Sequence, residues 1–284
     1  MSAHDLSGQN IIITGANTGI GKCTAEALAR RGARVIFAGR SAAKTQPVID
    51  QLKKDTGNDQ LEFLELDLGS LASVKKAADS FLARKLPLHV LINNAGLAGL
   101  SGLTVDGYQI TFGTNHLGPY LFTRLLHPAL KSAGTSRVVN VASRAHERCA
   151  GIDFEVLQKP ETSMKGLTEY GVSKLANVLF SKELGKRWAA DGIHTYSLHP
   201  GVIASDIWRN VPWPLRLMTK FMKTTEEGAV ASIQCAVGKE TANETGLYYG
   251  EDGRVRRQNR LVDDPALLEK LWSWSETQVR AYLP

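Results

Sequence analysis

Tyr170 and Lys174 have the side-chain types and the spacing needed for proton transfer. They lie in the run Tyr-Gly-Val-Ser-Lys, at the start of a predicted helix, and a spacing of four places both on one helix face. An ammonium beside a phenol favours the phenolate, so we expect the pKa of Tyr170 to be lowered from about 10. Such a phenol can donate or remove the proton of a C–O(H) group. Because this pair also occurs by chance in many helices, it needs support from other motifs.

Ser143 supplies a third polar group. It follows a strand pattern over residues 137–141. The carboxyl ends of parallel strands are where open α/β sheets bind ligands. We therefore expect the Ser143 hydroxyl to hold the substrate oxygen.

A glycine-rich turn over residues 14–22 predicts a second kind of site. Gly15, Gly19 and Gly21 lie between a strand pattern and a helix pattern. Glycines permit a tight turn and let backbone N–H groups approach a pyrophosphate, while the helix N-terminus adds a positive dipole end. An ordinary strand–helix turn is the alternative. A Walker-type ATP loop is disfavoured, because no Gly-Lys-Ser or Gly-Lys-Thr follows the glycines.

Arg40 indicates which dinucleotide would bind. An NAD-preferring site usually has Asp or Glu at the end of the second strand, to bond the ribose 2′-OH. Here that strand pattern ends at Arg40, and the first acidic residue after it is Asp50. Arg40 could hold a 2′-phosphate and stack on adenine, with Lys22 nearby; a solvated surface arginine is the alternative. The sequence therefore predicts NADP(H).

Short β-branched runs alternate with longer helical patterns along the whole chain. This alternation predicts an α/β fold: a single doubly wound (Rossmann) domain over residues 1–284, with a parallel sheet of about seven strands and helices on both faces. Two stretches interrupt the alternation, residues 144–169 and residues 202–223. The strand patterns cover residues 10–14, 34–38, 61–66, 89–93, 137–141 and 194–198.

These motifs resemble the short-chain dehydrogenase/reductase family, and within it the retinol-dehydrogenase-like branch. The resemblance extends from about Gly8 to the C-terminus. The runs that carry it are TGANTGIGK (14–22), FAGR (37–40), LDL (66–68), NNAG (93–96), TNHLGPYLFT (114–123), NVASRAH (140–146), YGVSK (170–174) and HPGV (199–202).

The resemblance implies a role for each catalytic residue. Tyr170 would be the general acid/base, Ser143 would orient the carbonyl, and Asn115 would hold a water in a proton relay with Lys174. Asp67 and Leu68 would contact adenine, and Asn93, Ala95 and Gly96 would line the ribose and stabilise the sheet. The implied cofactor-binding residues are Gly15, Asn17, Thr18, Gly19, Ile20, Gly21, Lys22, Arg40, Asp67, Leu68, Asn93, Ala95, Gly96, Tyr170, Lys174, Pro200, Gly201, Val202 and Ser205.

The implied activity is hydride transfer between NADP(H) and a carbonyl or alcohol. Residues 144–169 are expected to form an extra wall beside the carbonyl, and residues 202–223 an apolar substrate lid on the other side. Together they favour a small-molecule substrate that is lipophilic and fairly bulky: an aldehyde, a ketone or a retinoid. The alternative is a non-catalytic dinucleotide-binding regulator or scaffold. The enzyme is favoured because Asn115, Ser143, Tyr170 and Lys174 are all present.

Composition narrows the class of protein further. The 284 residues are 43% hydrophobic and 22% charged, which excludes a disordered chain, a collagen and a coiled-coil rod. No run approaches the roughly 18 apolar residues of a membrane span, and the first ten residues lack the apolar core of a signal peptide. We therefore expect a cytoplasmic protein. Three scattered cysteines predict neither a disulfide framework nor a metal site.

The formal net charge of +6 includes a basic cluster near the C-terminus, formed by Arg254, Arg256, Arg257 and Arg260. We interpret this cluster as a solvated face. Peripheral contact with an anionic membrane is less favoured, and no nucleic-acid motif accompanies the cluster. Many members of the family that the chain resembles pair through helices equivalent to residues 107–131 and 170–190, while some of this branch are monomers. A monomer or a homodimer is therefore expected.

Overall fold

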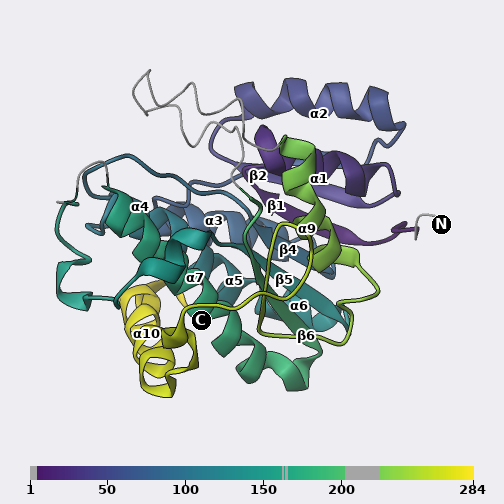
Figure 1. Ribbon diagram of the computed structural model, residues 1–284. Coiled ribbons are helices and arrows are strands. Elements are labelled where there is room, and N and C mark those ends of the chain that lie inside the picture. Colours follow the sequence, from purple (N-terminus) through teal and green to yellow (C-terminus); the bar gives the residue numbers. More distant parts are fainter. Residues whose placement is uncertain (1–4, 162, 164–165, 202–223) are drawn as a thin grey trace.

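The computed structural model is built around one parallel sheet of seven strands, in the order β3-β2-β1-β4-β5-β6-β7 (Figure 1). The structure describes residues 5–161, 163, 166–201 and 224–284. This sheet confirms the predicted doubly wound fold. The strand order reverses between β1 and β4: β2 and β3 lie on one side of β1, and β4 and the later strands lie on the other. Such a switch point opens a crevice at the carboxyl ends of the strands. The strands are β1 (Asn10–Thr14), β2 (Arg34–Gly39), β3 (Leu61–Glu65), β4 (Val90–Asn93), β5 (Ser136–Val141), β6 (Ile193–Leu198) and β7 (Leu247–Tyr249).

Helices cover both faces of the sheet (Figure 1). One face carries α1 (Gly19–Ala29), α2 (Ala42–Thr56) and α9 (Thr225–Val237). The other carries α3 (Leu71–Leu82), α5 (Gly118–Leu125), α6 (His127–Ser132) and α7 (Leu167–Trp188), with α10 (Pro265–Val279) outside them. The short elements are α4 (Ile110–Phe112), the π-helical turn η1 (Gly113–Leu117) and the 3₁₀ turns η2 (Arg144–Arg148), η3 (Phe154–Val156), η5 (Ala189–Asp191), η8 (Arg260–Asp263) and η9 (Arg280–Tyr282).

The hydrophobic core lies in two layers, because successive side chains of a strand point to opposite faces. In β1, Ile11 and Ile13 pack beneath α1 and α2, whereas Ile12 packs beneath α3 and α5. All three are 0% exposed. Burying a side chain of this size stabilises a fold by roughly 1.5–3 kcal/mol. An uninterrupted apolar strand is therefore favoured, and it fixes where the following glycine turn begins.

The predicted strand boundaries differ from the observed ones by at most one residue. The seventh strand, Leu247–Tyr249, has only three residues, which is too short for a periodic pattern to indicate it. Residues 144–169 fold as 3₁₀ turns and the first residues of α7, in so far as they are described. The lid predicted at residues 202–223 lies outside the described residues.

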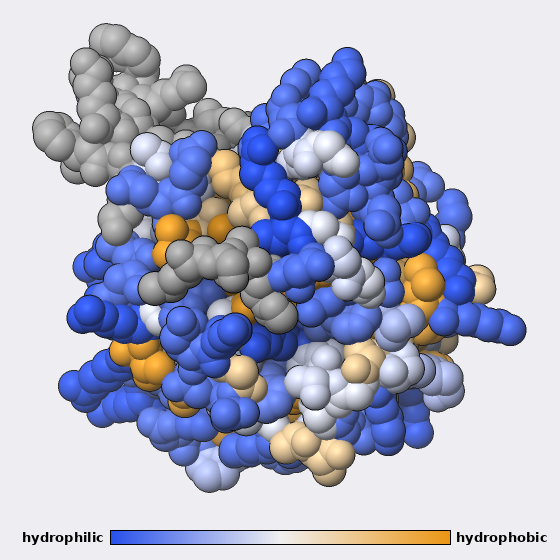
Figure 2. All heavy atoms as spheres, turned by 90° about the vertical axis from the view of Figure 1, so that its right-hand side faces the viewer, coloured by the Kyte–Doolittle hydropathy of each residue, from blue (hydrophilic) through white to orange (hydrophobic). Residues whose placement is uncertain are grey.

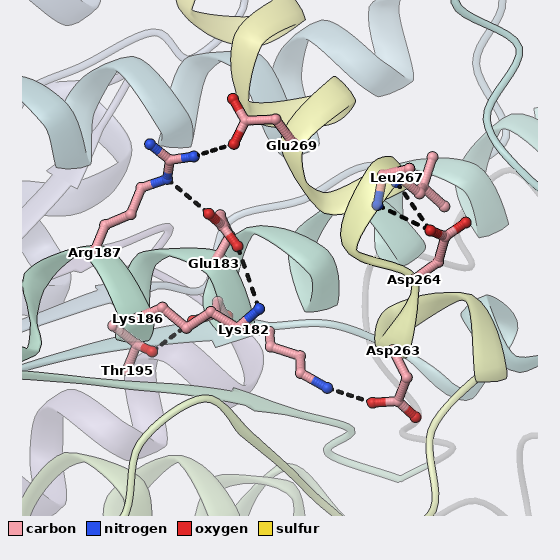
Figure 3. A network of polar contacts seen from close by, with 11 residues as sticks. Lys182, Glu183, Lys186, Arg187, Thr195, Asp263, Asp264, Leu267 and Glu269 are labelled. Carbon is pink, nitrogen blue, oxygen red and sulfur yellow. Dashed lines mark hydrogen bonds and ion pairs between the residues drawn. The ribbon is translucent and has the colours of Figure 1, made fainter.

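The C-terminal helix α10 packs against α5 and α7. The Trp272 ring lies 5.3 Å from that of Tyr120 between centroids, and Glu276 pairs with Arg124. At the outer surface, Arg187 of α7 pairs with Glu269, and Lys182 pairs with Asp263 (Figure 3). Part of the two helices through which family members are expected to pair is therefore covered by a helix of the same chain.

The face of the molecule shown in Figure 2 is mainly hydrophilic, with small and separate apolar patches among the described residues. Within the described ranges, no helix combines the length and the apolar character needed to cross a bilayer.

Candidate active site

A cleft of about 1750 Å³ opens at the carboxyl ends of the strands and joins the glycine turn to the predicted catalytic residues. Sites for single small molecules typically measure about 300–1,000 Å³, so this cleft has room for a dinucleotide and a second molecule. The sequence-predicted residues that line it are Gly15, Asn17, Thr18, Gly19, Ile20, Gly21, Arg40, Asp67, Leu68, Ala95, Gly96, Ser143, Tyr170, Lys174, Pro200 and Gly201.

Three of the predicted site residues are not among the described residues that line the cleft: Lys22, Asn93 and Asn115. Lys22 is half-buried in the first turn of α1. Two others, Val202 and Ser205, lie outside the described residues.

The glycine turn has no space for side chains at its closest approach. A Cβ on Gly21 would lie 2.5 Å from the Gly15 carbonyl oxygen and 2.6 Å from Asn94 Nδ2, and Gly15 has a φ of 67°. Thr18 precedes α1 without a side-chain cap, and the first turn of the helix contains no acidic residue. The N-terminal N–H groups of α1 are therefore suited to receive an anion, and the turn fits a dinucleotide pyrophosphate.

Asn94 ties the end of β1 to the loop after β4. Its side-chain amide donates to the Thr14 carbonyl oxygen at 2.8 Å, and the backbone N–H groups of Asn94 and Ala95 donate to Thr14 Oγ1 at 3.0 and 2.9 Å. These bonds hold Ala95 and Gly96 at the cleft wall. Sequence reasoning missed Asn94.

Asn93 differs in part from its expected role. Its side chain is buried on the other side of the sheet, where its Nδ2 donates to Asn140 Oδ1 at 2.8 Å and to Thr123 Oγ1 at 3.1 Å. It bonds to the neighbouring strand β5 and to α5, and it is not among the described residues that line the cleft. Because adjacent strand residues point to opposite faces, the period of two could have assigned these roles to Asn93 and Asn94.

Arg40 and Asp67 lie where the cleft meets β2 and β3. Arg40 is exposed and directly follows β2. One carboxylate oxygen of Asp67 accepts from the Gly69 N–H at 2.9 Å, which fixes the side chain at the wall. A guanidinium at this rim fits a phosphate on the ribose, because it offers several donors in one plane.

Ser143 is the N-cap of η2, just beyond the end of β5. Its Oγ accepts from the Ala145 backbone N–H at 3.2 Å. Because Oγ is the acceptor in this bond, the proton of the Ser143 hydroxyl points away from the Ala145 N–H. Burial raises the pKa of Tyr170, and a hydrogen bond from the Ser143 hydroxyl lowers it. Ser143 and Tyr170 therefore meet at the cleft wall.

The electrostatics of Tyr170 differ from the sequence expectation. The expectation was a lowered pKa caused by Lys174, but burial raises the pKa of Tyr170 overall. Burial also lowers the pKa of Lys174 to about 8, so Lys174 has lost its proton before Tyr170 would ionise. Its Nζ donates to the Val141 carbonyl oxygen at 2.7 Å and lies 5.6 Å from the centre of the Tyr170 ring. The chain alone therefore keeps Tyr170 protonated.

Asn115 lies behind the cleft wall in the π-helical turn η1, a distortion that is frequent at functional sites. Its side chain accepts from the Leu97 N–H at 2.8 Å, and donates to the Leu97 carbonyl at 2.9 Å and to Ser173 Oγ at 3.1 Å. A Cβ on Gly96 would lie 3.3 Å from Lys174 Nζ and 3.4 Å from Asn115 Oδ1. Asn115 thus anchors the loop after β4 beside Lys174.

The end of the cleft beyond Tyr170 has an apolar rim. We use this name for five side chains that line the cleft and are at least 37% exposed: Leu100, Leu103, Val105, Val156 and Leu167. Val156 and Leu167 belong to the segment 144–169, which was expected to form a wall there. Exposed apolar side chains gathered at a cleft mouth indicate a site for an apolar ligand.

Glu161 holds this rim together and was missed by sequence reasoning. It is 7% exposed, and its carboxylate accepts from the Gly102 N–H at 2.8 Å and from the Thr111 N–H at 3.0 Å. It thereby joins the segment 144–169 to the loop after β4 and to α4. No local pattern marks such a contact, because its partners lie about 50 residues away in sequence.

The chain belongs to the short-chain dehydrogenase family of oxidoreductases. The family model described as short chain dehydrogenase matches residues 9–153. Retinol dehydrogenase 12 of Mus musculus is 41% identical over 276 residues, which cover 95% of this chain and 86% of that protein. Human retinol dehydrogenase 11 is 40% identical, covering 96% of this chain and 86% of that protein.

A solved structure shares this fold. An uncharacterized protein from Mycobacterium paratuberculosis has a TM-score of 0.77 and is 33% identical, covering 98% of this chain and 96% of that one. The expected family and its retinol-dehydrogenase-like branch are confirmed.

Proposed function

We propose that the protein is an NADP-dependent oxidoreductase that transfers a hydride between the nicotinamide of NADP(H) and a lipophilic aldehyde, ketone or retinoid, or the corresponding alcohol. The observation that carries this proposal is one cleft with the glycine turn at one end and Ser143, Tyr170 and Lys174 at the other. The membership of the chain in an oxidoreductase family and its similarity to retinol dehydrogenases support the same activity.

In this mechanism the cofactor, when bound, supplies or accepts the hydride. The chain binds and orients the cofactor and the substrate and transfers the proton. The glycine turn and Arg40 would hold its phosphates, and Ala95, Gly96, Pro200 and Gly201 would form the wall beside it. The Ser143 hydroxyl would donate to the substrate carbonyl oxygen. Tyr170 would give its proton to that oxygen during reduction and remove it during oxidation. Lys174 would bond the ribose and, with Asn115, return a proton to Tyr170.

The choice of cofactor is tested at Arg40. We expect NADPH to bind more tightly than NADH by roughly 10–150-fold, because a charge-assisted hydrogen bond contributes about 1.5–3 kcal/mol. Arg40→Asp should reverse this preference, since it removes the phosphate partner and offers an acceptor for a ribose hydroxyl. The measurement is the Kd of each cofactor by fluorescence titration.

The exposed Arg257 lies outside the cleft and provides the control. Arg257→Asp changes the net charge by the same amount and should leave the ratio of the two Kd values unchanged. Equal affinity of the unmodified chain for NADPH and NADH would contradict the role of Arg40.

The apolar rim supports a lipophilic substrate. We expect kcat/KM for straight-chain aldehydes to rise with chain length before it levels off. Each methylene buried on the rim contributes up to about 0.8 kcal/mol, or roughly fourfold. Leu167→Asn should flatten this series. Val230→Asn is the matched control, because Val230 is 49% exposed and lies outside the cleft, whereas Leu167 is 54% exposed and lines it. A series that is flat or falls with length in the unmodified chain would contradict a lipophilic substrate.

A non-catalytic dinucleotide-binding regulator or scaffold is the second candidate. Such a protein would use the glycine turn to bind the dinucleotide. It would have no need for Tyr170 and Ser143 in the same cleft. Binding of NADPH without any turnover of carbonyl compounds would favour it. The cytoplasmic location, and the choice between a monomer and a homodimer, stay predictions from the sequence.

A further inference from the structure

The short turn that carries Ser143 is held by a residue far away in sequence. Asn259 lies between β7 and η8 and is 8% exposed. Its Nδ2 donates to the carbonyl oxygens of His146 at 2.9 Å and of Cys149 at 2.8 Å, and its backbone N–H donates to His146 Nε2 at 3.4 Å. Asn259 therefore holds the C-terminal half of η2.

His146 continues this contact to Ser143. Its ring is completely buried, and its Nδ1 lies 2.6 Å from the Ser143 carbonyl oxygen. A carbonyl oxygen can only accept, so Nδ1 carries the proton and Nε2 is left to accept from Asn259. Burial lowers the pKa of His146 overall and favours this neutral form, although the bond to the Ser143 carbonyl and the charge of Glu147 both act to raise that pKa. The Tyr248 ring, 4.7 Å away between centroids, packs edge-on against the imidazole.

We propose that His146 and Asn259 are positioning residues that set the direction of the Ser143 hydroxyl. The inference rests on the proposed function, in which Ser143 holds the substrate oxygen. Neither His146 nor Asn259 is among the described residues that line the cleft, so both act through the backbone of η2. Because the Ser143 carbonyl is bonded on one side and its Oγ is bonded to Ala145 on the other, the residue has little freedom to turn.

The geometry offers a conservative and a disruptive variant of the same residue. His146→Asn keeps a side-chain N–H at the position of Nδ1. His146→Leu keeps the volume but has no side-chain donor, so only the backbone N–H of residue 146 still bonds the Ser143 carbonyl oxygen, at 3.2 Å. We expect His146→Leu to lower kcat by about 10–100-fold, the effect of a small misplacement of a catalytic group. His146→Asn should retain most of the activity. In both variants the Kd for NADPH should remain within about twofold, because the contacts of the glycine turn are untouched.

The control is His194, whose Nδ1 also bonds a backbone carbonyl, that of Glu244, at 3.1 Å. His194 is in β6 and is not among the described lining residues. His194→Leu removes the same kind of contact and should leave kcat unchanged. Asn259→Ala tests the other end of the network and is expected to act like His146→Leu. It replaces that variant if His146→Leu does not fold.

A double-mutant cycle with Ser143→Ala separates positioning from a general loss of stability. If His146 acts through Ser143, then His146→Leu should slow the unmodified chain but add little in the Ser143→Ala background. Equal losses in both backgrounds would overturn the inference. Full activity of Ser143→Ala alone would instead contradict the proposed function.

Nitrogen NMR of the histidine side chains gives a readout that does not depend on turnover. We expect a neutral His146 ring protonated at Nδ1, with a signal that is lost in His146→Asn. A ring protonated at Nε2 would overturn the inference, because it could not donate to the Ser143 carbonyl.

Discussion

Replacing Tyr170 by phenylalanine is expected to slow carbonyl reduction by about 10²–10⁴-fold, because the variant keeps the ring but has no proton to transfer. The Kd for NADPH should change far less, since the glycine turn and Arg40 are untouched. Steady-state kinetics with a long-chain aldehyde, together with a separate titration of NADPH, measure the two effects independently.

Tyr196→Phe is the matched control for this prediction. Tyr196 is a buried residue of β6 whose hydroxyl donates to the Thr241 carbonyl at 2.8 Å, and it is not among the described lining residues. Losing this hydroxyl should cost about 1 kcal/mol of stability and leave kcat unchanged. A Tyr170→Phe variant that turns over at a normal rate would refute the assignment of the acid/base.

The pH dependence of carbonyl reduction and of alcohol oxidation follows from the protonation state of Tyr170. Burial raises the pKa of this phenol, so the protonated form needed for reduction persists to higher pH than for an exposed tyrosine. Oxidation needs the phenol to lose its proton, so its rate should rise with pH while the rate of reduction falls. Measurement of kcat in both directions over the same pH range checks the sign.

Lys174→Met is expected to damage both catalysis and cofactor binding. The methionine fills the buried space without a charge, and the proposed bonds of Lys174 to the ribose and toward Tyr170 are lost. We expect kcat to fall by about 10²–10⁴-fold and the Kd for NADPH to rise by roughly 10–150-fold, the effects of losing proton transfer and one charged hydrogen bond.

The control for this variant lies two turns further along the same helix. Lys182 of α7 pairs with Asp263 at the outer surface (Figure 3). Lys182→Met should change neither constant, because an exposed ion pair contributes at most about 1 kcal/mol to stability and lies away from the cleft. If Lys174→Met binds NADPH normally, Lys174 has no contact with the cofactor.

The sequence predicted the fold well because the strands are buried on both faces and therefore uniformly apolar. Strand β1 is buried on both faces, so the apolar run Ile11, Ile12 and Ile13 predicts a strand without any alternation of polar residues. The glycines after it mark a turn with no room for side chains. The same reasoning located most of the cleft, because residues at the carboxyl ends of parallel strands share one edge of the sheet.

Features that depend on tertiary contacts were not predictable in this way. The contact between Asn259 and His146 joins residues 113 positions apart, and no periodic pattern marks either one. The shift in the pKa of Tyr170 was predicted with the wrong sign, since the spacing of Tyr170 and Lys174 says nothing about how deeply both are buried. Desolvation, not proximity alone, decides which of the two groups is charged.

The most direct test of the proposed function is to follow the hydride itself. The purified 284-residue chain is incubated with NADPH carrying deuterium at both positions of nicotinamide C4 and with a long-chain aldehyde, and the alcohol is analysed by mass spectrometry. We expect one deuterium on the carbinol carbon of each alcohol molecule, one NADP⁺ formed per alcohol, and almost no product from Tyr170→Phe. Tight binding of NADPH without alcohol, or an alcohol without the label, would contradict it.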